Sequence, residues 1–121
     1  MSQNFQPGDF LVFQLEAGFA LLRLLAVDEQ DGGSSKTWHV AAYSEFFPDV
    51  DAAEAASMGP AALTVSEPHM ALTNRAFEST QVAKIGNITL DENETVPLDK
   101  WRADPNREVS DRSVRLMLGL R

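Results

Sequence analysis

The chain of 121 residues has no cysteine and only two histidines. The lack of cysteine excludes disulfides, thiolate metal sites and a cysteine nucleophile, and it fits a reducing cytosol. His39 and His69 lie thirty residues apart and match no metal-ligand spacing, so we predict no metal site and no cofactor. We interpret His39 as a packed strand residue and His69 as a turn residue.

Long hydrophobic runs are also missing. The longest apolar stretch, residues 19–27, is interrupted by Arg23 and has about half of the roughly 20 residues that a membrane helix needs. The first seven residues do not combine a basic segment with an apolar one, as a secretory signal does. We therefore expect a cytoplasmic protein with no membrane partner.

The sequence lacks the usual motifs of catalysis. It contains no glycine-rich phosphate loop and no Gly-x-Ser-x-Gly elbow. Asp49 and Asp51 begin like a calcium loop, but Ala53 occupies the third ligand position and Glu54 stands where glycine is needed. We predict no catalytic residue, and the composition favours binding over catalysis.

Basic residues are scarce in most of the chain. The net charge is −8, and residues 1–60 carry nine acids against only Arg23 and Lys36. A body of this charge repels phosphate backbones, so we expect no nucleic-acid partner. The acidity has two interpretations: it keeps the protein soluble, or it attracts a basic protein partner.

Apolar residues make up 44% of the chain, which is enough for one core, so residues 1–121 are expected to form a single domain. Apolar stretches at 10–15, 19–27 and 37–43 are separated by short links that contain glycine. Periodicity alone leaves helix and strand open for 19–27, but its short length and its flanking glycines favour a strand. We predict a three-stranded antiparallel meander.

Weaker patterns follow the meander. A short helix is expected from Asp51 to a stop at Gly59, because Asp51 and Glu54 have capping-box spacing; a mobile alanine-rich insertion would suit the composition equally. The other expected elements are short strands at 62–65 and 70–72 around a turn at Pro68, a strand at 81–86, and an exposed acidic loop at 91–94.

A C-terminal helix is expected over residues 111–118. Ser110 would cap it, Val109 and Val114 would form a hydrophobic staple, and Gly119 would end it. The predicted fold is thus mainly β within the α+β class: a small antiparallel barrel or a strongly bent sheet, with a short inserted helix and a C-terminal helix.

The start of the chain resembles a known group of proteins. Gly8 and Asp9 precede an apolar strand, and Gly18 and Arg23 follow it. This order resembles small SH3-like barrels and, more loosely, the bacterial toxin-immunity family numbered twenty-six, with Leu22 in place of the glycine before the arginine. The resemblance covers about the first third of the chain. It implies a non-enzymatic protein whose acidic loops bind a basic toxin.

Two sets of candidate residues follow. The acidic loops would supply the contacts to a basic partner, with two phenylalanines that are either anchors or core: Asp28, Glu29, Asp31, Glu45, Phe46, Phe47, Asp49 and Asp51. A small-ligand or enzymatic barrel would instead use a pocket formed by Arg23, His39 and Tyr43. A third alternative is a peptide-binding module with an exposed strand edge.

Arg23 interrupts an apolar strand, and a charge in that position must pair, reach solvent or serve a ligand. We expect it to pair with a carboxylate or to reach the rim, because long cationic side chains commonly run along apolar surface to water.

Overall fold

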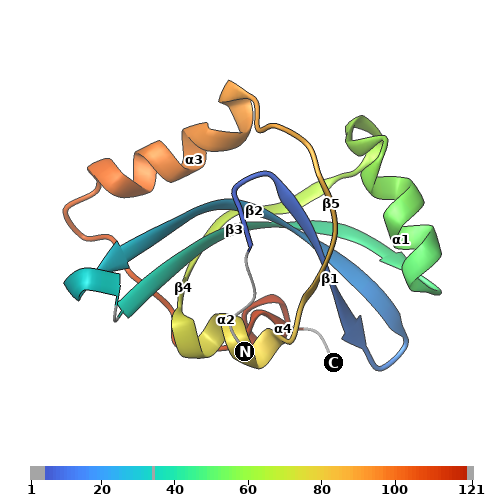
Figure 1. Cartoon of the computed structure of the whole chain (residues 1–121), viewed down its shortest axis with the longest axis horizontal. Coiled ribbons are helices and arrows are strands. Elements are labelled where there is room, and N and C mark those ends of the chain that lie inside the picture. Colours follow the sequence, from blue (N-terminus) through green and yellow to red (C-terminus); the bar gives the residue numbers. More distant parts are fainter. Residues whose placement is uncertain (1–4, 34, 120–121) are drawn as a thin grey trace.

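The structure is a computed structural model that describes residues 5–33 and 35–119, without the side chain of Asp31. The chain forms a five-stranded antiparallel sheet with helices on both faces (Figure 1). The strands, in the order β4-β3-β2-β1-β5 across the sheet, are β1 (Asp9–Leu15), β2 (Gly18–Gln30), β3 (Ser35–Phe47), β4 (Val65–Thr73) and β5 (Ala83–Asn87).

The helical segments connect and cover these strands. They are α1 (Val50–Ser57), α2 (Asn74–Thr80), α3 (Glu92–Ala103) and α4 (Val114–Leu118), with short 3₁₀ turns η1 (Asp31–Gly33) and η2 (Pro60–Ala62). None of the helices within the described residues is both long and apolar enough to cross a membrane.

The sheet is open and bent. Its edge strands β4 and β5 do not pair with each other, so the sheet is not closed into a barrel. The pairing of β2 with β3 shifts register between Ala20 and Leu22 and again between Leu24 and Ala26, and such irregularities bend a strand pair. The predicted α+β class with a strongly bent antiparallel sheet is confirmed.

The predicted meander is confirmed as β1, β2 and β3, and residues 19–27 lie in a strand. Both faces of β2 are apolar because helices cover both faces of the sheet. On one face, Leu22, Trp38 and Val40 pack with Phe77 of α2 and Val114 of α4. We call the opposite face, which α1 and α3 cover, the α1/α3 face.

Side chains of the α1/α3 face form two apolar clusters. Phe10 and Tyr43 pack with Ala53 of α1, whereas Leu25 packs with Leu98 of α3. Arg23 lies between these clusters, and His39 and Asp28 lie beyond the second one; these polar residues belong to the candidate site.

Two predictions about the middle of the chain are wrong. Residues 65–73 form one strand, β4, with Pro68 inside it, instead of two strands around a turn. An edge strand tolerates proline because one row of its backbone N–H groups has no neighbouring strand to pair with. Of the strand predicted at 62–65, Ala62 lies in η2 and only Val65 lies in a strand, as the first residue of β4.

Helix ends also differ from the prediction. The cap of α1 is Asp49, whose Oδ1 accepts a hydrogen bond from the Ala52 N–H at 2.7 Å, so α1 begins before Asp51. α4 begins after Ser113, whose hydroxyl caps it, while Ser110 instead pairs with Leu72 beside β4. Gly119 ends α4, as expected.

Residues 91–94, expected to be an exposed loop, are the start of α3. Asp91 Oδ1 accepts a hydrogen bond from the Glu94 N–H at 2.9 Å, and Glu94 Oε1 accepts one from the Asp91 N–H at 3.0 Å. This capping box fixes the first turn of α3 and directs the Glu94 side chain toward the sheet.

Candidate functional site

Arg23 lies on β2 under the first turn of α3 and is 1% exposed. Its Nε donates to Glu94 Oε2 at 2.8 Å, and a second guanidinium nitrogen donates to Glu94 Oε1 at 3.2 Å. The third nitrogen donates to the Gly8 carbonyl at 2.5 Å, and the guanidinium lies 4.3 Å from the centre of the Phe10 ring. Arg23 is therefore paired, as the sequence led us to expect.

Glu94 is held in its charged form by this pairing. Burial alone would raise the pKa of Glu94, but hydrogen bonds from Arg23 and from the Asp91 backbone, with the charge of Arg23, outweigh it and lower the pKa. The two charges compensate each other, so the Arg23–Glu94 pair contributes no net charge to its surroundings.

A second polar cluster lies under the last turns of α3. His39 is fully buried; its Nε2 lies 2.9 Å from Asp28 Oδ2, and its Nδ1 lies 2.9 Å from His69 Nε2. Arg102 donates to Asp28 Oδ1 at 2.6 Å, and the Trp101 ring stands with its centre 4.8 Å from that of His39. These residues join β2, β3 and β4 to α3.

Both histidines in this cluster favour the neutral state. Burial lowers the pKa of His69 to about 4, and burial also lowers the pKa of His39 despite the hydrogen bond and charge of Asp28. In the neutral pair, His39 donates its Nε2–H to Asp28 and accepts at Nδ1 from the Nε2–H of His69, which satisfies all three groups.

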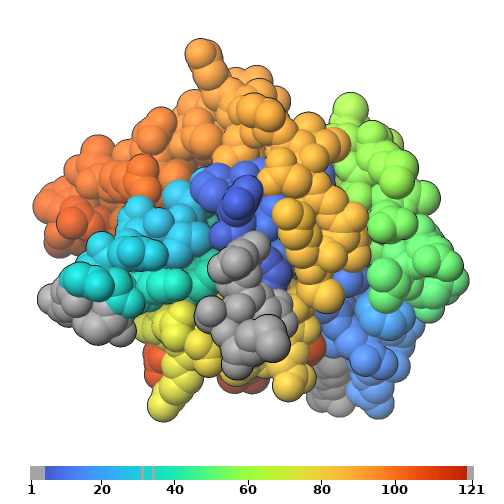
Figure 2. All heavy atoms as spheres, in the orientation of Figure 1, coloured from blue at the N-terminus to red at the C-terminus, as the bar shows by residue number. Residues whose placement is uncertain are grey.

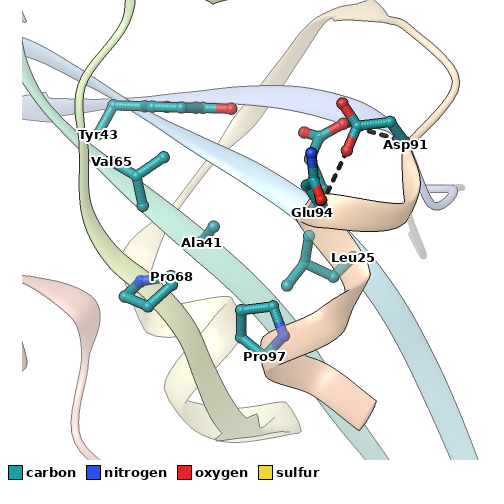
Figure 3. Close-up of a pocket in the computed structure, with 9 residues that line it drawn as sticks. Leu25, Ala41, Tyr43, Val65, Pro68, Asp91, Glu94 and Pro97 are labelled. Atoms are coloured by element: carbon teal, nitrogen blue, oxygen red, sulfur yellow. Dashed lines mark hydrogen bonds between the residues drawn. The ribbon is translucent and has the colours of Figure 1, made fainter. Parts of the chain in front are cut away.

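A groove of about 210 Å³ lies between the first half of α3 and strands β2, β3 and β4 (Figure 3). Its apolar walls come from Leu25, Ala41, Val65, Pro68 and Pro97. Its polar groups are Tyr43, Asp91, Asn93 and Glu94.

Tyr43 is the buried polar residue of this groove, with an exposed fraction of 7%. Its hydroxyl points along the groove toward Asp91 and Glu94 (Figure 3), and it makes no hydrogen bond with any residue that the structure describes. Burial raises the pKa of Tyr43 to about 12, so the hydroxyl is neutral at physiological pH. The hydroxyl can therefore donate or accept a hydrogen bond from a group in the groove.

The structure places the three residues of the expected pocket on one face but not around one cavity. Tyr43 lines the groove, and Arg23 lies behind Glu94 at its end. His39 lies toward the other end of α3, because its neighbour Trp101 is seven residues after Glu94, about 10 Å along a helix.

The eight expected partner contacts fall at two ends of the molecule. Asp28 and Glu29 lie at the η1 end of β2, and Asp31 has its side chain outside the described residues. The other five, at 45–51, lie around the start of α1 at the far end of β3 (Figure 1). Asp28 is opposite Thr37 in β3, and Phe46 is nine residues further along, which corresponds to roughly 30 Å.

The η1 end offers less free charge than expected, because Asp28 is bound to His39 and Arg102, and Glu29 lies opposite Lys36. Asp28 therefore links the sheet to α3, through His39 on β3 and Arg102 on α3. Burial would raise the pKa of Asp28, but His39 and Arg102 outweigh it and lower the pKa.

The α1 end has exposed acids and one exposed ring. Phe46 is 57% exposed, whereas Phe47 packs against the core cluster of Phe10 and Tyr43. Asp51 is exposed, while Asp49 is exposed and caps α1. The Thr64 N–H donates to Glu45, and this hydrogen bond lowers the pKa of Glu45.

Sequence reasoning missed the contribution of the first turn of α3, namely Asp91, Asn93 and Glu94. The spacing of Asp91 and Glu94 is that of a capping box, and this signal could have placed a helix start there. Comparison of the chain with protein-family models, with curated proteins and with solved structures finds no match.

Proposed function

We propose that this protein is a non-enzymatic binding domain that recognises a basic protein through its α1 end. The acidic end is defined here as Glu45, Asp49, Asp51 and Glu54 together with the exposed Phe46. In the form that the resemblance implies, the partner is a bacterial toxin and binding neutralises it.

The observation that carries this proposal is the set of carboxylates at the α1 end, none of which forms an ion pair with a residue that the structure describes, in the same stretch of chain as the exposed Phe46. The sequence from residue 37 to residue 74 contains five acids and no lysine or arginine. Val50 and Met58, on α1 and at its end, are 39% and 73% exposed, so apolar surface accompanies the charge. Figure 2 shows α1 at one extremity of the surface, accessible to a large partner.

The two features have different roles in association. Unpaired carboxylates attract a basic surface over distance and raise the association rate. An aromatic side chain in the middle of the contact supplies affinity, because its burial removes apolar surface from water. An acidic end with one exposed phenylalanine combines the two.

The peptide-binding alternative has less support. At the β4 edge, the Ser110 N–H donates to the Ala71 carbonyl at 2.8 Å and the Thr73 N–H donates to the Ser110 carbonyl at 2.9 Å, so part of this edge is already occupied. Pro68, in the same strand, has no N–H to offer a peptide.

The test is co-expression with a basic toxin candidate encoded by a neighbouring gene. We expect cell survival and a complex that is recovered at low salt. Phe46→Ala should weaken the complex at least about tenfold. Val109→Ala is the matched control, because Val109 is also exposed, at 42%, but lies far along the chain from the acidic end. Survival no better than without this chain, with no complex at low salt, would refute the proposal for that partner.

A further inference from the structure

We propose that the groove under α3 binds one cationic side chain, a lysine or an arginine, of the basic partner. This inference rests on the proposed function, since it assigns a specific contact within the same interface. The groove is distinct from the acidic end but adjoins it: Glu45 binds the Thr64 N–H, and the next residue, Val65, lines the groove.

The size of the groove suits a single side chain. Its volume of about 210 Å³ is below the roughly 300–1,000 Å³ of pockets that enclose drug-sized ligands. Leu25, Val65 and Pro97 provide apolar walls for an aliphatic stem, and the polar groups gather toward the first turn of α3 (Figure 3). A long side chain with an aliphatic stem and a polar tip would place its stem against the apolar walls and its tip at the polar end of the groove.

The charge at the polar end selects a cation. The negative charge of Glu94 is compensated by Arg23, but the carboxylate of Asp91 forms no ion pair with any residue that the structure describes. The start of a helix attracts anions by itself. Here Asp91, Glu92 and Glu94 occupy that first turn, so an incoming anion would be repelled.

Tyr43 supplies the second, independent observation. The ring of Tyr43 is buried, and its hydroxyl opens onto the groove with no hydrogen-bond partner among the described residues, so it is free to bind a ligand group there. The Tyr43 hydroxyl faces the groove and is neutral, so its oxygen can accept a hydrogen bond from an ammonium or guanidinium group. The side-chain carbonyl of Asn93, at the same groove, offers a further acceptor.

The test is a nuclear magnetic resonance titration of the full ¹⁵N-labelled chain with n-butylguanidinium and n-butylammonium at constant ionic strength. Butyrate and n-butanol serve as probes of the same stem with an anionic or a neutral tip. We expect saturable shifts of the Tyr43, Val65 and Asn93 amides with the two cations only. Shifts of equal size with n-butanol, or no saturable shift with either cation, would overturn the inference.

Two variants locate the contact. Asp91→Asn removes the charge but keeps the helix cap, because asparagine caps as well as aspartate; it should raise the Kd of butylguanidinium about two- to fivefold. Glu92→Gln changes the net charge equally, but Glu92 does not line the groove, so its Kd should stay unchanged. Equal effects of both variants would show attraction by overall charge alone and would contradict a specific contact.

Tyr43→Phe removes only the hydroxyl and should raise the Kd about two- to tenfold. If this variant fails to fold, the Asp91 and Glu92 pair still decides the question. Failure of the inference is distinguishable from failure of the proposed function. Groove variants that leave a real partner complex unchanged would remove this contact only, whereas butylguanidinium binding without any protein complex would remove the proposed function only.

Discussion

At the scale of single residues, the Arg23–Glu94 pair links the sheet to the start of α3 through two hydrogen bonds. Its two side chains are unequally buried: that of Arg23 is 2% exposed and that of Glu94 is 28% exposed. An unpaired charge costs more the less it can reach water. The two halves of this pair should therefore respond differently to mutation.

We expect Arg23→Met to destabilise the protein less than Glu94→Gln. The methionine leaves a carboxylate that can turn to water, whereas the glutamine leaves a buried guanidinium without a counter-charge while keeping the capping-box spacing. Arg23→Ala should cost about 3 kcal/mol, because it also loses the packing of the aliphatic stem. Urea unfolding followed by circular dichroism measures all three, and an Arg23→Met variant less stable than Glu94→Gln would contradict this account.

The pairing of Arg23 was predictable, but its partner was not. The sequence shows a charge in an apolar strand, which requires compensation somewhere. Glu94 lies 71 residues further along the chain, and no local rule connects positions that far apart. The groove depends on the same long-range contact, since α3 forms one of its sides.

At the scale of elements, α3 is attached to the sheet at both ends. Glu94 binds Arg23 at its start, and Trp101 and Arg102 contact the His39–Asp28 pair near its end. The meander was predictable because strand periodicity and glycine turns are local signals. α2 was not predicted; it follows directly on β4, and the left-handed Gln81 ends it.

The histidine pair makes the stability of this arrangement depend on pH. The pKa of His69 is about 4 in the folded state and near 6.5 when unfolded. Between about pH 6.5 and about pH 4, His69 is therefore protonated in the unfolded chain but neutral in the folded protein. The free energy of unfolding is highest above about pH 6.5 and decreases as the pH falls toward about 4. At lower pH the free energy of unfolding decreases further, because Asp28 and Glu94, whose pKa values are lowered in the folded protein, are protonated more readily in the unfolded chain.

His69→Gln removes one titrating group and keeps an N–H for His39. We expect the urea midpoint of this variant to change less between about pH 6.5 and about pH 4.5 than that of the unaltered protein. The remaining slope in this window belongs largely to His39, whose pKa is also lowered. Identical slopes for both proteins would show that His69 is not the group responsible.

The start of α1 offers a second test at this scale. Asp49→Ala should cost about 1 kcal/mol, because it leaves the Ala52 N–H without its cap. Asp51→Ala should cost less than about 0.5 kcal/mol, since Asp51 is an exposed first-turn residue. Thermal unfolding of the two variants compares their stabilities directly. A larger loss of stability in Asp51→Ala than in Asp49→Ala would contradict Asp49 as the cap and indicate Asp51 instead.

At the scale of the whole molecule, the acids of the expected partner contacts are divided between two ends. These ends are roughly 30 Å apart along β3, several times the Debye length of roughly 8 Å at physiological ionic strength. Charges at one end therefore have little effect on a partner at the other. The account requires that binding depends on the acidic end and not on net charge.

The most direct test is the association rate with a basic partner, measured by stopped flow across a range of salt concentrations. The double variant Asp51→Lys, Glu54→Lys alters the acidic end, and Glu29→Lys, Glu108→Lys makes the same change in net charge at exposed positions elsewhere. We expect the first variant to associate at least about tenfold more slowly at low salt, with a weaker salt dependence, and the second to stay close to the unaltered protein. Equal slowing by both variants, or association indifferent to salt, would contradict recognition through the acidic end.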